Sequence, residues 1–196
     1  MKNLWTGIVG FVAALVVLTS ILLGAQGQAP PSAVPEFRAD NELVRPQNYR
    51  EWIYLSSGLG MSYGPGASNN PNPPFDNVFV TPEAYRSFLQ TGTWPDKTMF
   101  VLELRGSASE GSINRGGRFQ GQVLGIEVEV KDEARFPGKW AFYGFNGNAA
   151  TAKPLPTTQS CYSCHAQNGA VDNTFVQFYP TLADIAKQKG TFKITP

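Results

Sequence analysis

The chain has 196 residues, a net charge of +1, 16% charged residues and 12% aromatic residues, with 20 glycines and 15 prolines. This length is sufficient for one domain with its own hydrophobic core. The near-neutral charge argues against a strongly basic nucleic-acid-binding surface. The frequent glycine and proline favour a loop-rich, β-containing fold over a helical bundle.

The N-terminal segment has the features of an export signal. A positive charge precedes a mostly apolar run at residues 4–23, and small residues around Gly27 suit a cleavage site. An uncleaved membrane anchor is the alternative, because the run approaches the roughly 20 residues that span a bilayer. We therefore expect a signal peptide or membrane anchor at residues 1–27, a flexible leader at 28–40 and the folded domain at 41–196. Either interpretation places that domain outside the cytoplasm, in the periplasm or an equivalent compartment.

Strands are predicted where aromatic and β-branched residues gather, in residues 48–55, 75–80, 97–105, 118–131 and 139–145. The first of these segments also suits a short helix, because of its Arg50-Glu51 pair. In the fourth segment the residues alternate, which places Leu124, Ile126, Val128 and Val130 on one face of the strand. Glu127 and Glu129 then fall on the other face.

Two helices are predicted, each with start and stop signals. Residues 82–91 follow Thr81 as N-cap and end before Gly92, and residues 180–189 end before Gly190. Both begin with proline, which suits the first position of a helix. Polar, glycine-rich loops are expected at 56–74, 107–117 and 146–158. The fold class is therefore α+β and mainly β: an antiparallel sheet with a few helices.

The motif that indicates chemistry is Cys161-Tyr162-Ser163-Cys164-His165. Two cysteines three apart, followed directly by histidine, are typical of a c-type haem attachment site. Two thiols at this spacing can add to the two vinyl groups of a porphyrin, and the adjacent imidazole can hold the iron. We predict one haem c, attached through Cys161 and Cys164, with His165 as metal ligand and the fold enclosing the haem.

Other interpretations of the motif are weaker. The chain has two cysteines and one histidine, too few for a structural zinc site with four such ligands. A disulfide between Cys161 and Cys164 would close a very short loop and stabilise little. A redox-active dithiol remains an alternative. Because the chain has one histidine, the sixth iron position is left for another side chain, water or a ligand; Met61 and Met99 are candidate ligands.

With these elements placed, the chain resembles the cytochrome P-460 family and its relative, cytochrome c′-beta. The resemblance covers nearly all of the folded part. It rests on NYREW at 48–52, VTPEAYRSFLQTG at 80–92, VLEL at 101–104, GIEVEVKD at 125–132, KWAFYGF at 139–145, CYSCH at 161–165 and FVQFYPTL at 175–182.

The resemblance implies a mostly β homodimer with one haem c, His165 on the proximal side and an open distal side. In the P-460 enzymes, which oxidise hydroxylamine, a strand lysine is cross-linked to the haem edge and a distal glutamate assists proton transfer. In cytochrome c′-beta an apolar pocket binds nitric oxide and carbon monoxide. Here Leu102 occupies the lysine position, and the nearby Lys97 has the wrong strand parity. Glu127 is the counterpart of the distal glutamate.

Several residues are candidates for the distal pocket. Leu102 and Phe100 share one strand face and are expected to line it, and Phe79 in the preceding strand, like Phe75, would supply an aromatic cap. Plain core packing is the alternative for all of them. Glu127 is the candidate catalytic group, as a proton carrier, whereas Glu129 is expected at the surface.

Three functions follow, in this order. The first is a five-coordinate haem c protein that binds small gases, chiefly nitric oxide or carbon monoxide. The second is an oxidoreductase acting on hydroxylamine or nitric oxide, with Glu127 as proton relay. The third is a plain electron-transfer cytochrome. The expected partners are a small gaseous or nitrogenous ligand, a redox partner cytochrome and a second copy of the chain; no nucleic acid is expected.

Overall fold

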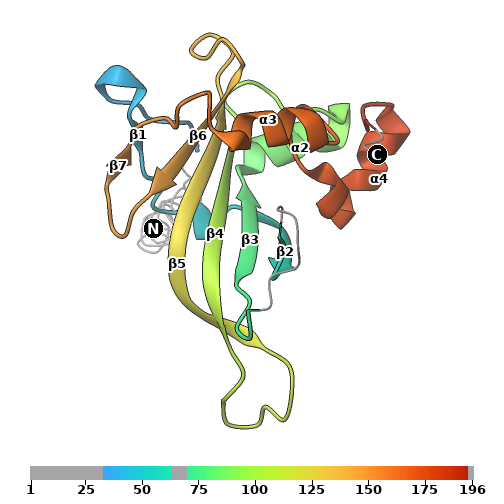
Figure 1. The fold of residues 1–196 in the computed structure, drawn as a ribbon. Coiled ribbons are helices and arrows are strands. Elements are labelled where there is room, and N and C mark those ends of the chain that lie inside the picture. The colour runs from blue at the N-terminus through green and yellow to red at the C-terminus, as the bar shows by residue number, and fades with distance from the viewer. Residues whose placement is uncertain (1–32, 63–69, 194–196) are drawn as a thin grey trace, which may run out of the picture. The chain divides into compact units, whose positions relative to one another are not determined.

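Five antiparallel strands form the main sheet, in the order β2-β3-β4-β5-β6 (Figure 1). They are β2 (Ile53–Leu59), β3 (Phe75–Val80), β4 (Met99–Ala108), β5 (Phe119–Lys131) and β6 (Trp140–Phe145). A second, two-stranded sheet pairs β1 (Leu43–Val44) with β7 (Thr151–Ala152). The β4–β5 hairpin extends beyond the other strands (Figure 1). The predicted fold class, α+β and mainly antiparallel β, is confirmed.

The computed structural model describes residues 33–62 and 70–193. The chain divides into residues 1–32, which lie outside this description, and a unit of residues 33–196. The predicted signal peptide or anchor at 1–27 therefore lies outside the described residues. In the described part of the chain, no helix combines the length and apolar character needed to cross a bilayer.

The helices lie where the start and stop signals predict them. Helix α2 spans Pro82–Thr91 and helix α4 spans Pro180–Lys189, each followed by a glycine in the left-handed region. The Thr81 side chain makes no capping hydrogen bond, so Pro82 at the first position carries the start signal. Helix α3 spans Ser160–Asn168. Short 3-10 helices are η1 (Ala39–Asn41), η2 (Tyr49–Glu51) and η3 (Val176–Phe178).

The structure differs from the sequence predictions at several element ends. Residues 48–55 contain both predicted alternatives, because the 3-10 helix η2 leads directly into β2. Strand β2 continues to Leu59, which shortens the predicted loop. Leu124 is 56% exposed instead of sharing the buried face of Ile126. The pairing with β4 is irregular beside it, where Leu104 faces Gly125 and Arg105 faces Val123, and a bulge of this kind re-aims side chains.

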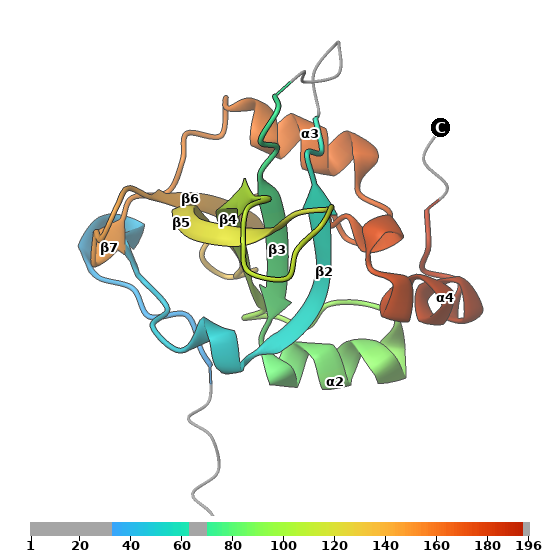
Figure 2. The same ribbon diagram turned by 90° about the horizontal axis from the view of Figure 1, so that it is seen from below.

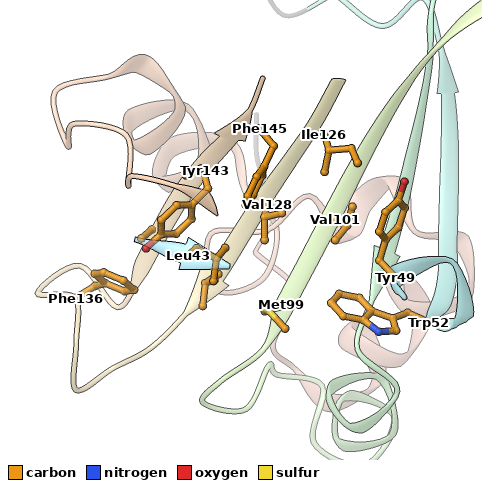
Figure 3. Close-up of a cluster of buried hydrophobic side chains, with 13 residues drawn as sticks. Leu43, Tyr49, Trp52, Met99, Val101, Ile126, Val128, Phe136, Tyr143 and Phe145 are labelled. Carbon is orange, nitrogen blue, oxygen red and sulfur yellow. The ribbon is translucent and has the colours of Figure 1, made fainter. Parts of the chain in front are cut away.

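Strand alternation gives the main sheet two differently covered faces. On one face Met99, Val101, Ile126, Val128 and Val130 pack against residues of β1, η2 and β7 (Figure 3). On the other face Val80 and Phe100 pack against residues of α2 and α4, including Phe88 and Leu182. Helix α3 crosses this second side, whereas β1, β7 and η2 lie toward the first (Figure 2).

Candidate functional site

Helix α3 places the three residues of the cysteine–histidine motif on one side. Cys161, Cys164 and His165 stand at positions i, i+3 and i+4, which lie one above another on a helix. Both cysteines are free thiols. The helix has no buried residue, so it is held by its ends and its neighbours more than by an apolar stripe. All three side chains line one cavity.

This cavity lies between α3 and the second face of the main sheet. It measures about 320 Å³, within the range of roughly 300–1,000 Å³ common for small-molecule sites. Val78, Phe100 and Leu102 line it from the sheet, and Phe142 and Phe175 line it beside the motif. The strand register explains this set, because Leu102 lies directly opposite Val78 in β3 and opposite Glu127 in β5.

The imidazole of His165 is held by its Nδ1 atom. Nδ1 lies 2.9 Å from the carbonyl oxygen of Asn173, so Nδ1 carries the proton and Nε2 is the nitrogen able to bind a metal. The rings of Phe142 and Phe175 flank the imidazole, with centroid separations of 4.5 Å and 4.4 Å. Tyr162 holds the adjoining segment by donating to the Leu155 carbonyl at 3.1 Å.

The loop after α3 is built to bring the Asn173 carbonyl to this point. A side chain at Gly169 would lie 2.6 Å from the carbonyl carbon of Asn173, so the loop packs directly against the helix end. Asp172 and Asn173 both adopt left-handed backbone conformations, with φ of 48° and 62°. Lys131 on β5 holds the loop through a 2.5 Å ion pair with Asp172.

Two carboxyl groups of β5 face the cavity, and they differ in environment. Glu127 is exposed in the cavity lining. The side chain of Glu129 is only 12% exposed, and its Oε1 lies 3.4 Å from His165 Nδ1. The prediction of a surface position for Glu129 is therefore wrong. Alternation correctly predicts that both acids share one face, but the packing of His165 against Glu129 cannot be read from strand periodicity.

Burial and mutual contact shift the pKa values of Glu129 and His165. Burial raises the pKa of Glu129, and the neighbouring His165 opposes that rise only in part. Burial alone would lower the pKa of His165, but the charge of Glu129 and the hydrogen bond to Asn173 outweigh it, so the pKa is raised. Each of the two charged groups therefore favours the charged form of the other.

The sequence reasoning missed a third acid, Asp76 on β3. It is 8% exposed and lines the same cavity. Burial raises the pKa of Asp76, and the negative charge of Glu127 raises it further. Strand parity would have indicated it, because Asp76 shares a face with Val78, which lies opposite Leu102.

Most predicted site residues come together in the cavity. Its lining includes the motif residues and three further predicted ones, namely Phe100, Leu102 and Glu127. The prediction that Phe79 forms an aromatic cap over the cavity is wrong. It lies opposite Val101 in the register, on the other face, where its ring contacts Tyr49 and Tyr54 at 5.6 Å each. Phe75 has the same strand parity as Phe79 and does not line the cavity either.

The two candidate methionine ligands lie on opposite faces of the sheet, and the candidate lysine is paired elsewhere. Met61 lines the cavity, whereas Met99 is buried in the core on the other face. Lys97 lies before β4, and its Nζ is 2.5 Å from the Asp132 carboxylate. Leu102 is the residue that faces the cavity from the predicted cross-link position. No lysine is found among the described residues that line the cavity.

The set of donor side chains fits a haem better than a bare metal ion. Two free thiols and one imidazole lie on one side of a helix, and a largely apolar, aromatic-walled cavity lies against them. This combination suits a flat porphyrin joined to the helix through thioethers, with Nε2 as iron ligand. Across residues 33–62 and 70–193, no cluster of three or more His, Cys, Asp and Glu side chains is arranged to hold a bare metal ion.

Comparison with known proteins agrees with this geometry. The family model described as Cytochrome P460 matches residues 46–176, which is more than half of the 196-residue chain. The match covers η2, the whole main sheet and the cysteine–histidine motif. No curated protein matches the chain. The chain therefore belongs to the cytochrome P460 family, whose members are haem-binding cytochromes.

Proposed function

We propose that this protein is an exported mono-haem c-type cytochrome that binds a small gas such as nitric oxide or carbon monoxide. Cys161 and Cys164 attach the haem, and His165 is its proximal ligand. The observation that carries the proposal is the placement of Leu102. An apolar side chain faces the cavity where the P-460 enzymes have a cross-linking lysine. When bound, the haem would supply an iron able to take up a small ligand and a one-electron redox couple.

The chain's own residues would bind and orient the haem and select its ligand. The Asn173 carbonyl fixes the imidazole orientation of His165 through Nδ1. Val78, Phe100 and Leu102 present an apolar wall, which favours a small uncharged ligand over a polar one because it offers no hydrogen bonds. Glu127 and Asp76 are the nearby acids able to hold or release a proton.

Gas binding is the test of this proposal. We expect the optical spectrum of the ferrous protein to be that of a five-coordinate haem, and to change on adding carbon monoxide or nitric oxide. A six-coordinate spectrum that neither gas perturbs would contradict the proposal and favour an electron-transfer cytochrome. In that case Met61→Leu should abolish the sixth ligand. Met99→Leu is the matched control, because Met99 is buried on the opposite face of the sheet.

An oxidoreductase acting on hydroxylamine or nitric oxide is the second candidate. Asp76 and Glu127 in the cavity lining favour it. Burial and the charge of Glu127 raise the pKa of Asp76, and a carboxyl with a raised pKa is better suited to proton transfer near neutral pH. Under the gas-binding proposal the wild-type protein should not oxidise hydroxylamine with an artificial electron acceptor.

Leu102→Lys tests whether the missing amine is what separates these two functions. We expect this variant to gain hydroxylamine oxidation and an altered haem spectrum, because the new side chain faces the cavity from β4. Leu102→Met is the matched control, since it keeps a long side chain without an amine. Turnover by the wild-type protein at a rate similar to that of Leu102→Lys would replace the gas-binding proposal with the enzyme.

We propose that the domain is exported, by a cleaved signal or an N-terminal anchor, and that it works as a homodimer that exchanges electrons with a redox partner cytochrome. The near-neutral net charge of +1 gives no support for nucleic acid as a partner.

A further inference from the structure

Glu129 is a buried acid that the proposed gas binding does not use. In the register it lies between two buried aromatic residues, Phe100 on β4 and Phe142 on β6. Its Oε1 atom is fully buried and makes no hydrogen bond of good geometry in the described residues. The nitrogen His165 Nδ1 lies 3.4 Å from Oε1. A buried carboxyl oxygen without a good partner costs free energy, so its position calls for an explanation.

Two residues of strand β5, Glu129 and Lys131, act on the surroundings of the His165 imidazole. Two residues beyond Glu129 on the same face, Lys131 pairs with Asp172 at 2.5 Å. Asp172 precedes Asn173, whose carbonyl oxygen lies 2.9 Å from His165 Nδ1. The single N–H of Nδ1 is therefore donated to the Asn173 carbonyl, and the Glu129 carboxyl oxygen lies beside it at 3.4 Å. Both oxygens depend on β5, one directly and one through the loop.

We propose that Glu129 is a positioning residue that tunes His165 as an iron ligand from its buried place beside Nδ1. The proposal rests on the proposed function, in which His165 holds the haem iron. A carboxylate beside the Nδ1–H of a ligand histidine increases the basicity of that histidine, more than a neutral carbonyl does. Stronger donation from Nε2 strengthens the iron–histidine bond and favours ferric over ferrous iron. Glu129 therefore holds the reduction potential low.

Resonance Raman spectroscopy of the ferrous holoprotein tests the proposal without any assay of activity. The iron–histidine stretching frequency should fall in Glu129→Gln, which removes the charge but keeps the size of the side chain. It should fall further in Glu129→Leu, which removes both side-chain oxygens. If a sixth ligand is present, the band is measured after photolysis of the carbon monoxide complex. We also expect the reduction potential of Glu129→Gln to rise by about 59 mV, a tenfold shift of a one-electron equilibrium.

Glu127→Gln is the matched control, because it removes an equal charge from the same strand face two residues away. Loss of either charge raises the reduction potential through space, but only the Glu129 change should move the iron–histidine frequency. Equal frequencies in the wild type and Glu129→Gln would overturn the proposal and leave His165 as the ligand. A wild-type spectrum without histidine ligation would instead overturn the proposed function. If Glu129→Gln does not fold, Glu129→Asp, which keeps the charge but draws the carboxylate back, gives the same comparison.

Discussion

The double variant Cys161→Ser/Cys164→Ser should release its haem on denaturation, whereas the wild-type protein should keep it. The two thiols lie on the cavity side of α3 beside the proposed iron ligand, and serine cannot form the thioethers that join haem c to a chain. Both proteins should be produced with the cytochrome c maturation machinery and then extracted with acidified acetone. Haem should appear in the organic phase for the variant only, and the wild-type mass should exceed that of the bare polypeptide by one haem.

Ser163→Ala is the control for this experiment. Ser163 lies between the two cysteines on the same helix, is exposed, and donates only to the Ser160 carbonyl. Its replacement should leave the haem attached. A colourless wild-type protein after haem maturation, or a double variant that retains haem through denaturation, would end the proposal of covalent attachment. The first result would also remove the basis for the iron ligand and the gas site.

The two faces of the main sheet have different roles: one packs into the hydrophobic core, and the other lines the cavity. Period-two alternation sends Val101, Ile126 and Val128 into the packed core of Figure 3. It sends Leu102 and Glu127 to the side that α3 covers. Changes on the cavity face can therefore alter ligand chemistry while the opposite core keeps the sheet folded. This separation is what makes Leu102→Lys an informative substitution.

Local signals predicted a large share of this arrangement. The bounds of α2, α4 and β3 follow from proline, glycine and branched residues near each element, and the structure gives the same residues. The grouping of Cys161, Cys164 and His165 on one side of the cavity follows from their spacing. These features depend on neighbours in sequence, which the sequence displays directly.

The failures have a common physical cause, which is dependence on a partner far along the chain. Phe79 lies in the predicted strand, but the face of β3 that meets the cavity depends on the register with β4, which the sequence does not display. The sequence predicts a surface position for Glu129 because nothing local reveals that His165, which is held by the loop after α3, lies against it. That loop relies on left-handed backbone at Asp172 and Asn173, and neither residue is a glycine that would mark the turn.

The core face of the sheet also holds one buried charge, Glu103 on β4. Its side chain is 2% exposed. Arg105 Nε donates to its Oε1 at 2.5 Å, and Tyr49 and Arg50 donate to its Oε2. Burial alone would raise the pKa of Glu103, but these hydrogen bonds and the arginine charges outweigh it and lower the pKa. Burial and the same hydrogen bond raise the pKa of Tyr49 to about 12.

Glu103→Ala should be among the most destabilising single substitutions outside the site. The substitution leaves the buried Tyr49 hydroxyl and the partly buried Arg105 without their acceptor, and each such loss costs about 1–3 kcal/mol. Together these losses are a large part of the roughly 5–15 kcal/mol that holds a typical domain folded. Urea denaturation of the holoprotein, followed by circular dichroism, measures the loss. Glu110→Ala is the control, since Glu110 is exposed in the β4–β5 turn, and it should leave the free energy of unfolding unchanged.

The contribution of Glu103 should also depend on pH in a defined direction. Because its pKa is lower in the folded chain than the ordinary value of 4.5, Glu103 stabilises the fold above that value. This stabilisation is lost as the pH falls through the folded-state pKa. The side chain of Glu103→Gln cannot titrate. The difference in free energy of unfolding between this variant and the wild type should therefore be largest at pH 7 and should become smaller in acid. Asp132, whose pKa is also lowered by Lys97 and Arg135 against the effect of burial, remains in both proteins and cannot produce that narrowing. A constant gap across this range would show that Glu103 acts through its shape and hydrogen bonds instead of its charge.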